Sequence, residues 1–225
     1  IWFICFSLPL ILKINNVNKK KKKINENLFI EVITNIKSLF SQSNKGRFLL
    51  ARMIYTDGLN TLFAFGGLYA AGTFHMSFSE IIVFGILINI TAGLGALFFS
   101  FIEDRIGAKY VINISLIFLI IFGCITLIIN SKELFLLFGS ALGFFIGSIQ
   151  SSSRSFMSRY IVNGNNAETY GIYAVSGKCT AFLGPALLAL IVSIFDSQRA
   201  GMASIILFFL LGLYLLQKVE EPKHY

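Results

Sequence analysis

Six long apolar segments, joined by short connections, constrain this chain more than any other feature of its sequence. They lie near residues 49–71, 78–101, 110–130, 133–153, 169–193 and 200–217. A helix needs roughly 20 apolar residues to cross a hydrocarbon core of about 30 Å. Backbone groups inside a bilayer must also pair with one another, which a helix achieves within one segment. The sequence therefore predicts an all-α integral membrane bundle with six transmembrane helices in residues 49–217.

The charged residues are few and grouped. Only 13% of the residues are charged and 56% are hydrophobic, whereas a soluble domain has roughly 25% charged residues. Fifteen of the 19 lysines and arginines lie on four segments that six spans place on one face: 13–48, 102–109, 154–168 and 218–225. Positive charge accumulates on cytoplasmic loops, so we expect this face in the cytoplasm. Topology thus explains the net charge of +8 without a nucleic-acid partner.

The residues before the first span divide into two parts. Residues 1–12 are apolar but too short to span, and lysines follow rather than precede them. We interpret them as the truncated end of a preceding transmembrane helix and not as a signal peptide. Residues 13–48 are predicted to form a cytoplasmic loop. It contains the basic run Lys19–Lys23, which reflects topology or binds anionic lipid head groups. Apolar residues from Leu28 to Phe40 recur at helical spacing, which predicts an amphipathic helix on the membrane surface or against the bundle.

Patterns typical of metal sites and enzymes are missing from the sequence. Cys5, Cys124 and Cys179 are unevenly spaced in apolar segments, which does not indicate a disulfide framework or a metal site. The two histidines, His75 and His224, do not form a ligand motif, and no Gly-x-Ser-x-Gly elbow is present. We therefore expect no cofactor, no metal and no enzymatic activity.

Charged and polar residues within the apolar segments are the main indication of function. Arg52, Asp57 and Asn60 lie in the first predicted span and Lys178 lies in the fifth. A charge at mid-membrane costs about 2.5–3.5 kcal/mol on insertion scales, so such groups normally face the bundle interior or a wet cavity. Asp57 and Lys178 lie at similar depths from the same face, because each residue of a helix rises by about 1.5 Å. We predict that these groups line a solute or proton pathway, and the alternative is a structural ion pair between Asp57 and Lys178.

The fourth and fifth spans carry weaker signals. Gln150 and Arg154 form a polar cluster near the cytoplasmic end of the fourth span, either in the pathway or as an interfacial anchor. Small residues at four-residue spacing predict close helix contacts. They are Gly139, Gly143 and Gly147 in the fourth span. Gly93 and Ala96, three residues apart, predict the same kind of contact in the second span. The pair Gly184-Pro185 predicts a bend in the fifth span, because proline lacks the N–H that a helix requires.

The connection between the second and third spans, Ser100 to Lys109, reads SFIEDRIGAK. It resembles the signature loop of major facilitator transporters, Gly-x-x-x-Asp-Arg-x-Gly-x-Lys/Arg, with Ser100 in place of the leading glycine. The resemblance implies a gating role on the cytoplasmic face for Asp104, Arg105, Gly107 and Lys109. It also implies that Asp104 pairs with Arg154 or Arg159 in one state of the transporter.

A narrower resemblance covers about residues 48–217. The stretches 51–60, 150–155, 170–178 and 197–201 are similar to the major facilitator branch that contains vacuolar amino-acid effluxers linked to autophagy. The resemblance implies the C-terminal half of a twelve-helix permease that moves a small solute by alternating access, with amino acids as the implied solutes. Its partners would be the lipid bilayer, the solute and a missing N-terminal six-helix half.

The resemblance and the charge distribution also imply where the protein resides. We expect a multi-pass protein of a bacterial plasma membrane, or of a vacuolar membrane if the source is eukaryotic, with residues 218–225 as a cytoplasmic tail. A non-transporting membrane sensor or interaction module is the alternative function. The amphipathic segment and the lysine run would suit that alternative, whereas the charges within the spans favour transport.

Overall fold

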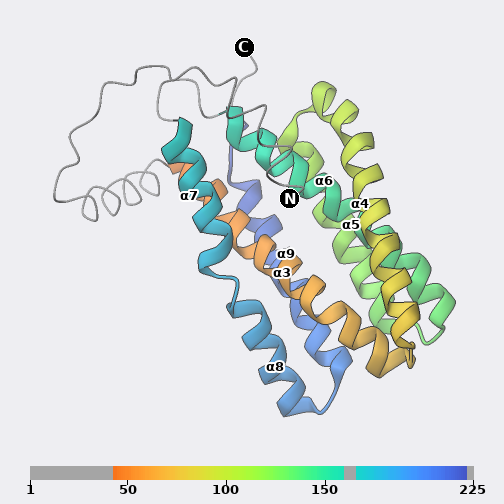
Figure 1. Ribbon diagram of the computed structural model, residues 1–225. Coiled ribbons are helices and arrows are strands. Elements are labelled where there is room, and N and C mark those ends of the chain that lie inside the picture. The colour runs from red at the N-terminus through yellow and green to blue at the C-terminus, as the bar shows by residue number, and fades with distance from the viewer. Residues whose placement is uncertain (1–42, 160–165, 222–225) are drawn as a thin grey trace, which may run out of the picture. The chain divides into compact units, whose positions relative to one another are not determined.

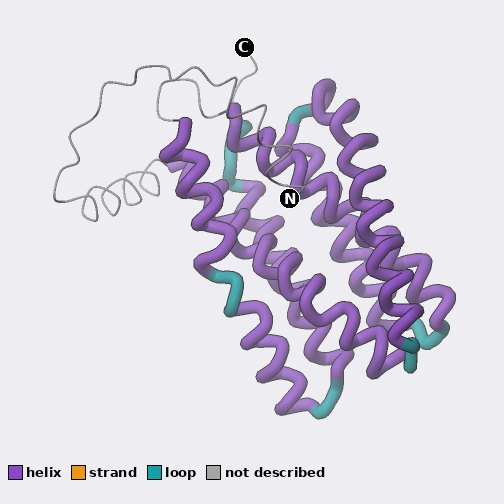
Figure 2. The backbone as a smooth tube through the Cα atoms, viewed as in Figure 1, coloured by secondary structure: helices purple, strands orange, loops and turns teal. Residues whose placement is uncertain are grey.

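The computed structural model describes residues 43–159 and 166–221 of the protein. Three predicted features, the truncated helix at 1–12, the basic run and the amphipathic helix, lie outside these residues. Within the described ranges every regular element is a helix, and the helices are joined by short loops (Figure 2). They are α3 (Ser43–Phe74), α4 (Phe78–Ile106), α5 (Ala108–Ile128), α6 (Lys132–Arg159), α7 (Asn166–Cys179), α8 (Leu183–Phe195) and α9 (Gln198–Gln217).

Five described segments are long and apolar enough to cross a membrane. They are α4, α5, α6, residues Tyr170–Phe195 of α7 and α8, and α9. The protein is therefore a helical membrane bundle, as the sequence predicts. Helix α3 has 32 residues, which is also long enough, but it carries Arg52, Asp57 and Asn60 and is not among the five segments that are apolar enough to cross. That α3 crosses the membrane as a sixth span stays a prediction.

Two predicted loops are largely helical in the structure. Helix α4 continues to Ile106, and the single residue Gly107 separates it from α5, so the predicted loop 102–109 reduces to one sharp turn. Gly107 has a φ of 90°, in the region where a residue with a Cβ is strained. Helix α6 continues to Arg159, into the predicted loop 154–168. Apolar residues mark the part of a helix that lies in lipid, but the hydrogen bonds of the helix continue into the polar region beyond it.

The helices pack in a pattern of corresponding pairs. Helix α4 packs chiefly on α6, α3 on α9, and α5 on α6. Figure 1 shows α4, α5 and α6 on one side of α3 and α9, with α7 and α8 on the other. The helices α3, α4 and α5 correspond in order to α6, α7–α8 and α9. Under this correspondence the packing of α3 on α9 matches that of α6 on α5, and the packing of α4 on α6 matches that of α7–α8 on α3. Three-plus-three repeats of major facilitator halves give this correspondence.

Glycines bring α4 and α6 into backbone contact. A Cβ at Gly147 would lie 1.9 Å from the carbonyl oxygen of Ala92, and one at Gly143 would lie 2.7 Å from that of Ile88. The predicted glycine ladder of the fourth span is thus confirmed as a packing surface. The prediction for Gly93 is wrong, because nothing lies within 4 Å of its Cβ position. Gly95, two residues further on and on another face of α4, meets the carbonyl of Phe144 instead.

The fifth predicted span is broken into two helices. Helix α7 ends at Cys179 and α8 begins at Leu183, with a turn over residues 180–182 between them. Pro185 lies in the first turn of α8, where its missing N–H is tolerated. The predicted interruption is therefore present, and it lies just before the Gly184-Pro185 pair. It leaves the end of α7 and the start of α8 beside the part of α3 that carries Arg52 and Asp57.

Candidate functional site

A polar cavity of about 210 Å³ lies between α3, α6 and α7. Its lining consists of Arg52, Tyr55, Thr56, Leu59, Asn60, Ile149, Gln150, Ser153, Arg154 and Tyr173. Four of the predicted site residues, two from α3 and two from α6, are therefore brought together in space. We refer to this cavity as the α3–α6–α7 cavity.

The cavity has a fixed inner wall and an open polar rim. The buried Tyr55 hydroxyl and the buried Ser153 hydroxyl lie 2.7 Å apart, which ties α3 to α6 by a hydrogen bond. Asn60, Gln150 and Arg154 are exposed. Their amide and guanidinium groups can donate hydrogen bonds to a solute, and the two amides can also accept them. The lining contains no acidic residue, so its formal charge is positive.

Arg52 spans from α3 to α7. Its Nη1 donates hydrogen bonds to the Tyr173 carbonyl oxygen at 2.6 Å and to the Ser176 hydroxyl at 2.9 Å. Its guanidinium also lies 3.5 Å from the centre of the Tyr173 ring, in cation–π geometry. These contacts fall in the last two turns of α7, where the helix dipole favours a cation. Arg52 therefore holds the C-terminal end of α7 against α3 instead of reaching to the membrane interface.

Asp57 spans from α3 to α8, on the other side of the break. Its side chain is buried, with 1% of the residue exposed. Oδ2 accepts a hydrogen bond of 2.9 Å from the backbone N–H of Gly184, the second residue of α8. A carboxylate at a helix N-terminus is stabilised by the exposed N–H groups and by the helix dipole. Arg52 and Asp57 thus hold the two ends of the broken span, each at the end that its charge suits.

The predicted alternative of an ion pair between Asp57 and Lys178 is not formed. Lys178 lies on the exposed side of the last turn of α7, whereas Asp57 is turned towards α8. Periodicity alone placed both groups at similar depth, but it could not show that the helix breaks between them. The break supplies one N–H donor to Asp57, from Gly184, in place of a cation beside it.

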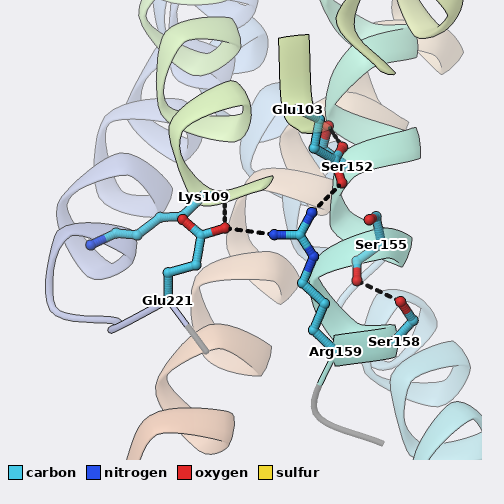
Figure 3. Close-up of polar contacts among 7 residues, drawn as sticks. All are labelled: Glu103, Lys109, Ser152, Ser155, Ser158, Arg159 and Glu221. Atoms are coloured by element: carbon cyan, nitrogen blue, oxygen red, sulfur yellow. Dashed lines mark hydrogen bonds and ion pairs between the residues drawn. The ribbon is translucent and has the colours of Figure 1, made fainter. Parts of the chain in front are cut away.

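A second polar cluster lies at the end of the bundle that carries Gly107, which we call the Gly107 end (Figure 3). Arg159 of α6 pairs with the Glu103 carboxylate at 3.2 Å and with the Glu221 carboxylate at 2.9 Å. Glu103 is buried, and its other oxygen accepts a hydrogen bond of 2.6 Å from the Ser152 hydroxyl. The Lys109 backbone N–H also donates to Glu221 at 3.4 Å. The cluster therefore joins α4, α5, α6 and the segment after α9.

The predicted gating residues occupy different places around this cluster. Asp104 and Arg105 are exposed, and in this structure Arg159 pairs with Glu103 instead of Asp104. Arg154 lies at the rim of the α3–α6–α7 cavity, away from the loop. Gly107 and Lys109 do take part. A Cβ at Gly107 would lie 2.5 Å from a Glu221 carboxylate oxygen, and the Lys109 ammonium donates to the Gln217 carbonyl.

Sequence reasoning missed Glu103, although a signal for it was present. Gly95, Phe99 and Glu103 follow one another at four-residue spacing and are all buried. Had α4 been extended to Ile106, this face would have pointed Glu103 towards α6 and Asp104 away from it. Gly184 and Glu221 gave no comparable signal, because their roles depend on where separate helices end.

Two further cavities are mainly apolar. One of about 220 Å³ lies between α3, α4, α5, α6 and α9, with Asn89 of α4 and Thr126 of α5 among its few polar residues. The other, of about 330 Å³, lies between α3, α8 and α9 and is lined by Leu188, Val192 and similar side chains. Within the described residues no group of three or more His, Cys, Asp or Glu side chains could hold a metal ion. The α3–α6–α7 cavity is thus the most polar of the three.

Comparison with known proteins identifies the family. The sequence profile described as "Vacuole effluxer Atg22 like" matches residues 1–224. The chain belongs to this family. Its description names an effluxer, so the family is one of transporters and not a class of enzymes, in agreement with the prediction from the sequence.

Individual Atg22-like and related proteins match at low identity. An uncharacterised major-facilitator-type transporter of Bacillus subtilis, YxiO, is 21% identical over 222 residues, which cover 98% of this chain and 52% of YxiO. Autophagy-related protein 22 of Cryptococcus neoformans is 24% identical over 192 residues, which cover 78% of this chain and 34% of that protein. Autophagy-related protein 22-1 of Aspergillus fumigatus is 26% identical over 193 residues. The chain thus spans about half the length of YxiO and about a third of the fungal relatives. No solved structure gives a significant match.

Proposed function

We propose that this chain supplies the C-terminal half of a secondary transporter, and that the α3–α6–α7 cavity forms its half of the solute pathway. The observation that carries the proposal is the cavity itself. Arg52, Asn60, Gln150 and Arg154 gather in a bundle whose helices are otherwise apolar. Intramembrane polar groups are costly, and they are kept where a solute or an ion passes.

The match to relatives about twice as long supports a second half that completes the cavity. Helices equivalent to α3 and α6 line the central cavity of major facilitator transporters, between two halves that rock around a midplane site. In this proposal Asn60, Gln150, Arg154 and the exposed Lys178 face the other half and the solute. Asp57 and Arg52 set the shape of the broken fifth span behind them.

Amino acids are the proposed solutes, and export from the cytoplasm or vacuole is the proposed direction. The family description, a vacuole effluxer, supports the direction. The cavity supports a small polar solute, because its lining offers hydrogen-bond donors and positive charge that suit a carboxylate. The proposed orientation puts the Gly107 end in the cytoplasm, where Asp104, Arg105, Gly107, Lys109 and Arg159 take part in gating.

Solute flux into proteoliposomes tests the proposal. The full-length protein is reconstituted and assayed with individually radiolabelled amino acids, with labelled sugars for comparison. At least one labelled amino acid is expected to enter faster than into protein-free liposomes, and Arg154→Gln is expected to slow this entry. Folded protein that moves none of these solutes would support the alternative, a non-transporting sensor. Unchanged flux in both Arg154→Gln and Lys178→Met would show that the cavity rim is not part of the pathway.

Gating at the Gly107 end has its own test. The variant Asp104→Asn is assayed for flux and for the balance of inward-open and outward-open states, measured by thiol labelling of cysteines placed on each side. A gating role predicts that both quantities change. If neither changes, Asp104 has no part in gating.

A further inference from the structure

We propose that Asp57 binds a proton in exchange for its contact with the first turn of α8, so that the shape of the broken fifth span is coupled to proton movement. This inference rests on the proposed transport function and names the ion that drives it. The charged carboxylate is held when the N-terminus of α8 is docked on α3, as in this structure. The protonated form belongs to the state in which α8 has moved away.

The two carboxylate oxygens of Asp57 differ in their hydrogen bonding. Oδ2 accepts the Gly184 N–H at 2.9 Å, whereas Oδ1 is buried and has no hydrogen-bond partner among the described residues. A buried acceptor without a partner costs about 1–3 kcal/mol, and more when it is charged. In native proteins such an atom calls for an explanation. This cost leaves the charged form only marginally stable with α8 docked, so loss of the single Gly184 donor is enough to favour a proton on Oδ1.

The start of α8 offers Asp57 a single backbone donor. The Leu183 N–H donates to the Thr180 carbonyl at 2.8 Å, and the Ala186 N–H donates to the Phe182 carbonyl at 3.0 Å. Pro185 has no N–H. Only the Gly184 N–H therefore remains in the first turn for a partner outside the helix, and Asp57 takes it. Docking of α8 supplies this donor together with the positive end of the helix dipole.

The groups packed around Asp57 do not replace that donor. Arg52 is engaged by Tyr173 and Ser176 on α7, and Lys178 is exposed. On the side of α9, the neighbours are the Phe208 and Phe209 side chains beside Gly58. The titratable Tyr55 bonds Ser153 of α6, Tyr173 lies under Arg52, and Arg154 of α6 lines the cavity. No salt-bridge partner of Asp57 is therefore present among the described residues.

Coupling follows from these contacts. When α8 withdraws, the Asp57 carboxylate loses its donor and dipole in an apolar setting, and binding a proton from water on the accessible side is the remaining way to stabilise it. When α8 docks again, the proton leaves Oδ1 to water on the other side. Proton binding and α8 docking therefore oppose each other, and by linkage each shifts the equilibrium of the other. The docked contact is close, because a Cβ at Gly184 would lie 2.0 Å from the Thr61 hydroxyl.

The first experiment measures proton coupling in proteoliposomes of the full-length protein. The solute is the labelled amino acid found to be transported, and an internal pH dye reports proton movement. In the wild type, solute flux is expected to carry protons and to respond to an imposed pH gradient. In Asp57→Asn, exchange of labelled for unlabelled solute is expected to persist, while the response to the gradient is lost. Glu80→Gln is the matched acid control, because the Glu80 carboxylate pairs with Lys132 at the end of the bundle opposite the Gly107 end. This variant is expected to keep the response to the pH gradient.

Coupling in Asp57→Asn equal to the wild type would overturn the inference and leave the transport proposal intact. A second experiment does not depend on transport or on the folding of that variant. Infrared difference spectra of the purified wild-type protein between high and low pH are expected to show the C=O band of a protonated, buried carboxyl that shifts with ¹³C-aspartate labelling. The absence of such an aspartate band would overturn the inference even if no solute flux were found.

Discussion

At the residue scale, the charged side chains of this protein act as connectors between helix ends. Arg52 and Asp57 hold the two sides of the break in the fifth span. Arg159 joins two carboxylates at the Gly107 end, one of them on the buried Glu103. Each connection gives a partner to a charge that would otherwise be desolvated alone, so removal of one member leaves the other without that partner.

The variant Arg159→Gln tests this cost. It leaves the buried Glu103 carboxylate with the Ser152 hydroxyl alone. Breaking a buried ion pair from one side costs about 3–5 kcal/mol. We expect the low end of that range, because 16% of the Arg159 side chain is exposed. Thermal unfolding of the detergent-solubilised protein measures the loss, with Arg105→Gln as the exposed control.

A double variant of the same cluster separates the effect of the unpaired charge on stability from the effect of lost packing. Adding Glu103→Gln to Arg159→Gln removes the stranded charge, so the double variant is expected to be more stable than the sum of the single losses implies. Strict additivity of the two changes would show that the pair does not stabilise the Gly107 end.

At the element scale, close contact between α4 and α6 depends on residues that have no side chain. The carbonyls of Ile88 and Ala92 on α4 lie where the Cβ atoms of Gly143 and Gly147 would be. Small residues allow helices in lipid to gain packing and weak polar contacts that longer side chains would prevent. The α4–α6 pair is thereby positioned so that Gln150 and Arg154, further along α6, face the α3–α6–α7 cavity.

Gly147→Ala tests the contact between these helices. A single methyl group 1.9 Å from the Ala92 carbonyl forces the helices apart. Overpacking of this kind costs about 1–3 kcal/mol. The matched control Gly93→Ala adds the same methyl group where nothing lies within 4 Å. We expect a lower unfolding temperature for Gly147→Ala alone, and equal temperatures for the two variants would contradict the contact.

The elements themselves were largely predictable from the sequence, whereas their partners were not. Apolar length located every described span, and the spacing of Gly139, Gly143 and Gly147 gave the packing face of α6. The break before Gly184 turned Asp57 away from Lys178, and the extension of α4 put Glu103 in the contact expected of Asp104. Hydropathy cannot predict these changes, because they depend on where a helix ends relative to a helix distant in sequence.

At the scale of the whole molecule, the chain belongs to a family of transporters, forms a helical membrane bundle and spans about half the length of YxiO. The charge distribution predicts its orientation. Fifteen of the 19 lysines and arginines fall on the four segments that the predicted topology places on the same face as Gly107, namely 13–48, 102–109, 154–168 and 218–225. Positive charge of this kind is retained in the cytoplasm.

Thiol labelling of intact cells tests the orientation. Single cysteines are placed in a full-length, otherwise cysteine-free protein at Phe78, which is 79% exposed near the start of α4, or at the exposed Arg105 near its end. A membrane-impermeant maleimide is expected to label Phe78→Cys in intact cells and Arg105→Cys only after permeabilisation. The reverse pattern would place the Gly107 end outside and contradict the predicted topology.

We propose that the solute passes through the α3–α6–α7 cavity, and the transport kinetics of cavity variants test this path. Initial rates of labelled amino-acid transport are measured over a range of solute concentrations for the full-length wild type, Gln150→Ala and Asn89→Ala. Asn89 is an asparagine of the mainly apolar cavity that bonds its own helix at the Gly85 carbonyl. We expect a raised KM for Gln150→Ala and wild-type kinetics for Asn89→Ala. Wild-type kinetics for Gln150→Ala together with a raised KM for Asn89→Ala would contradict this path and place the pathway in the other cavity.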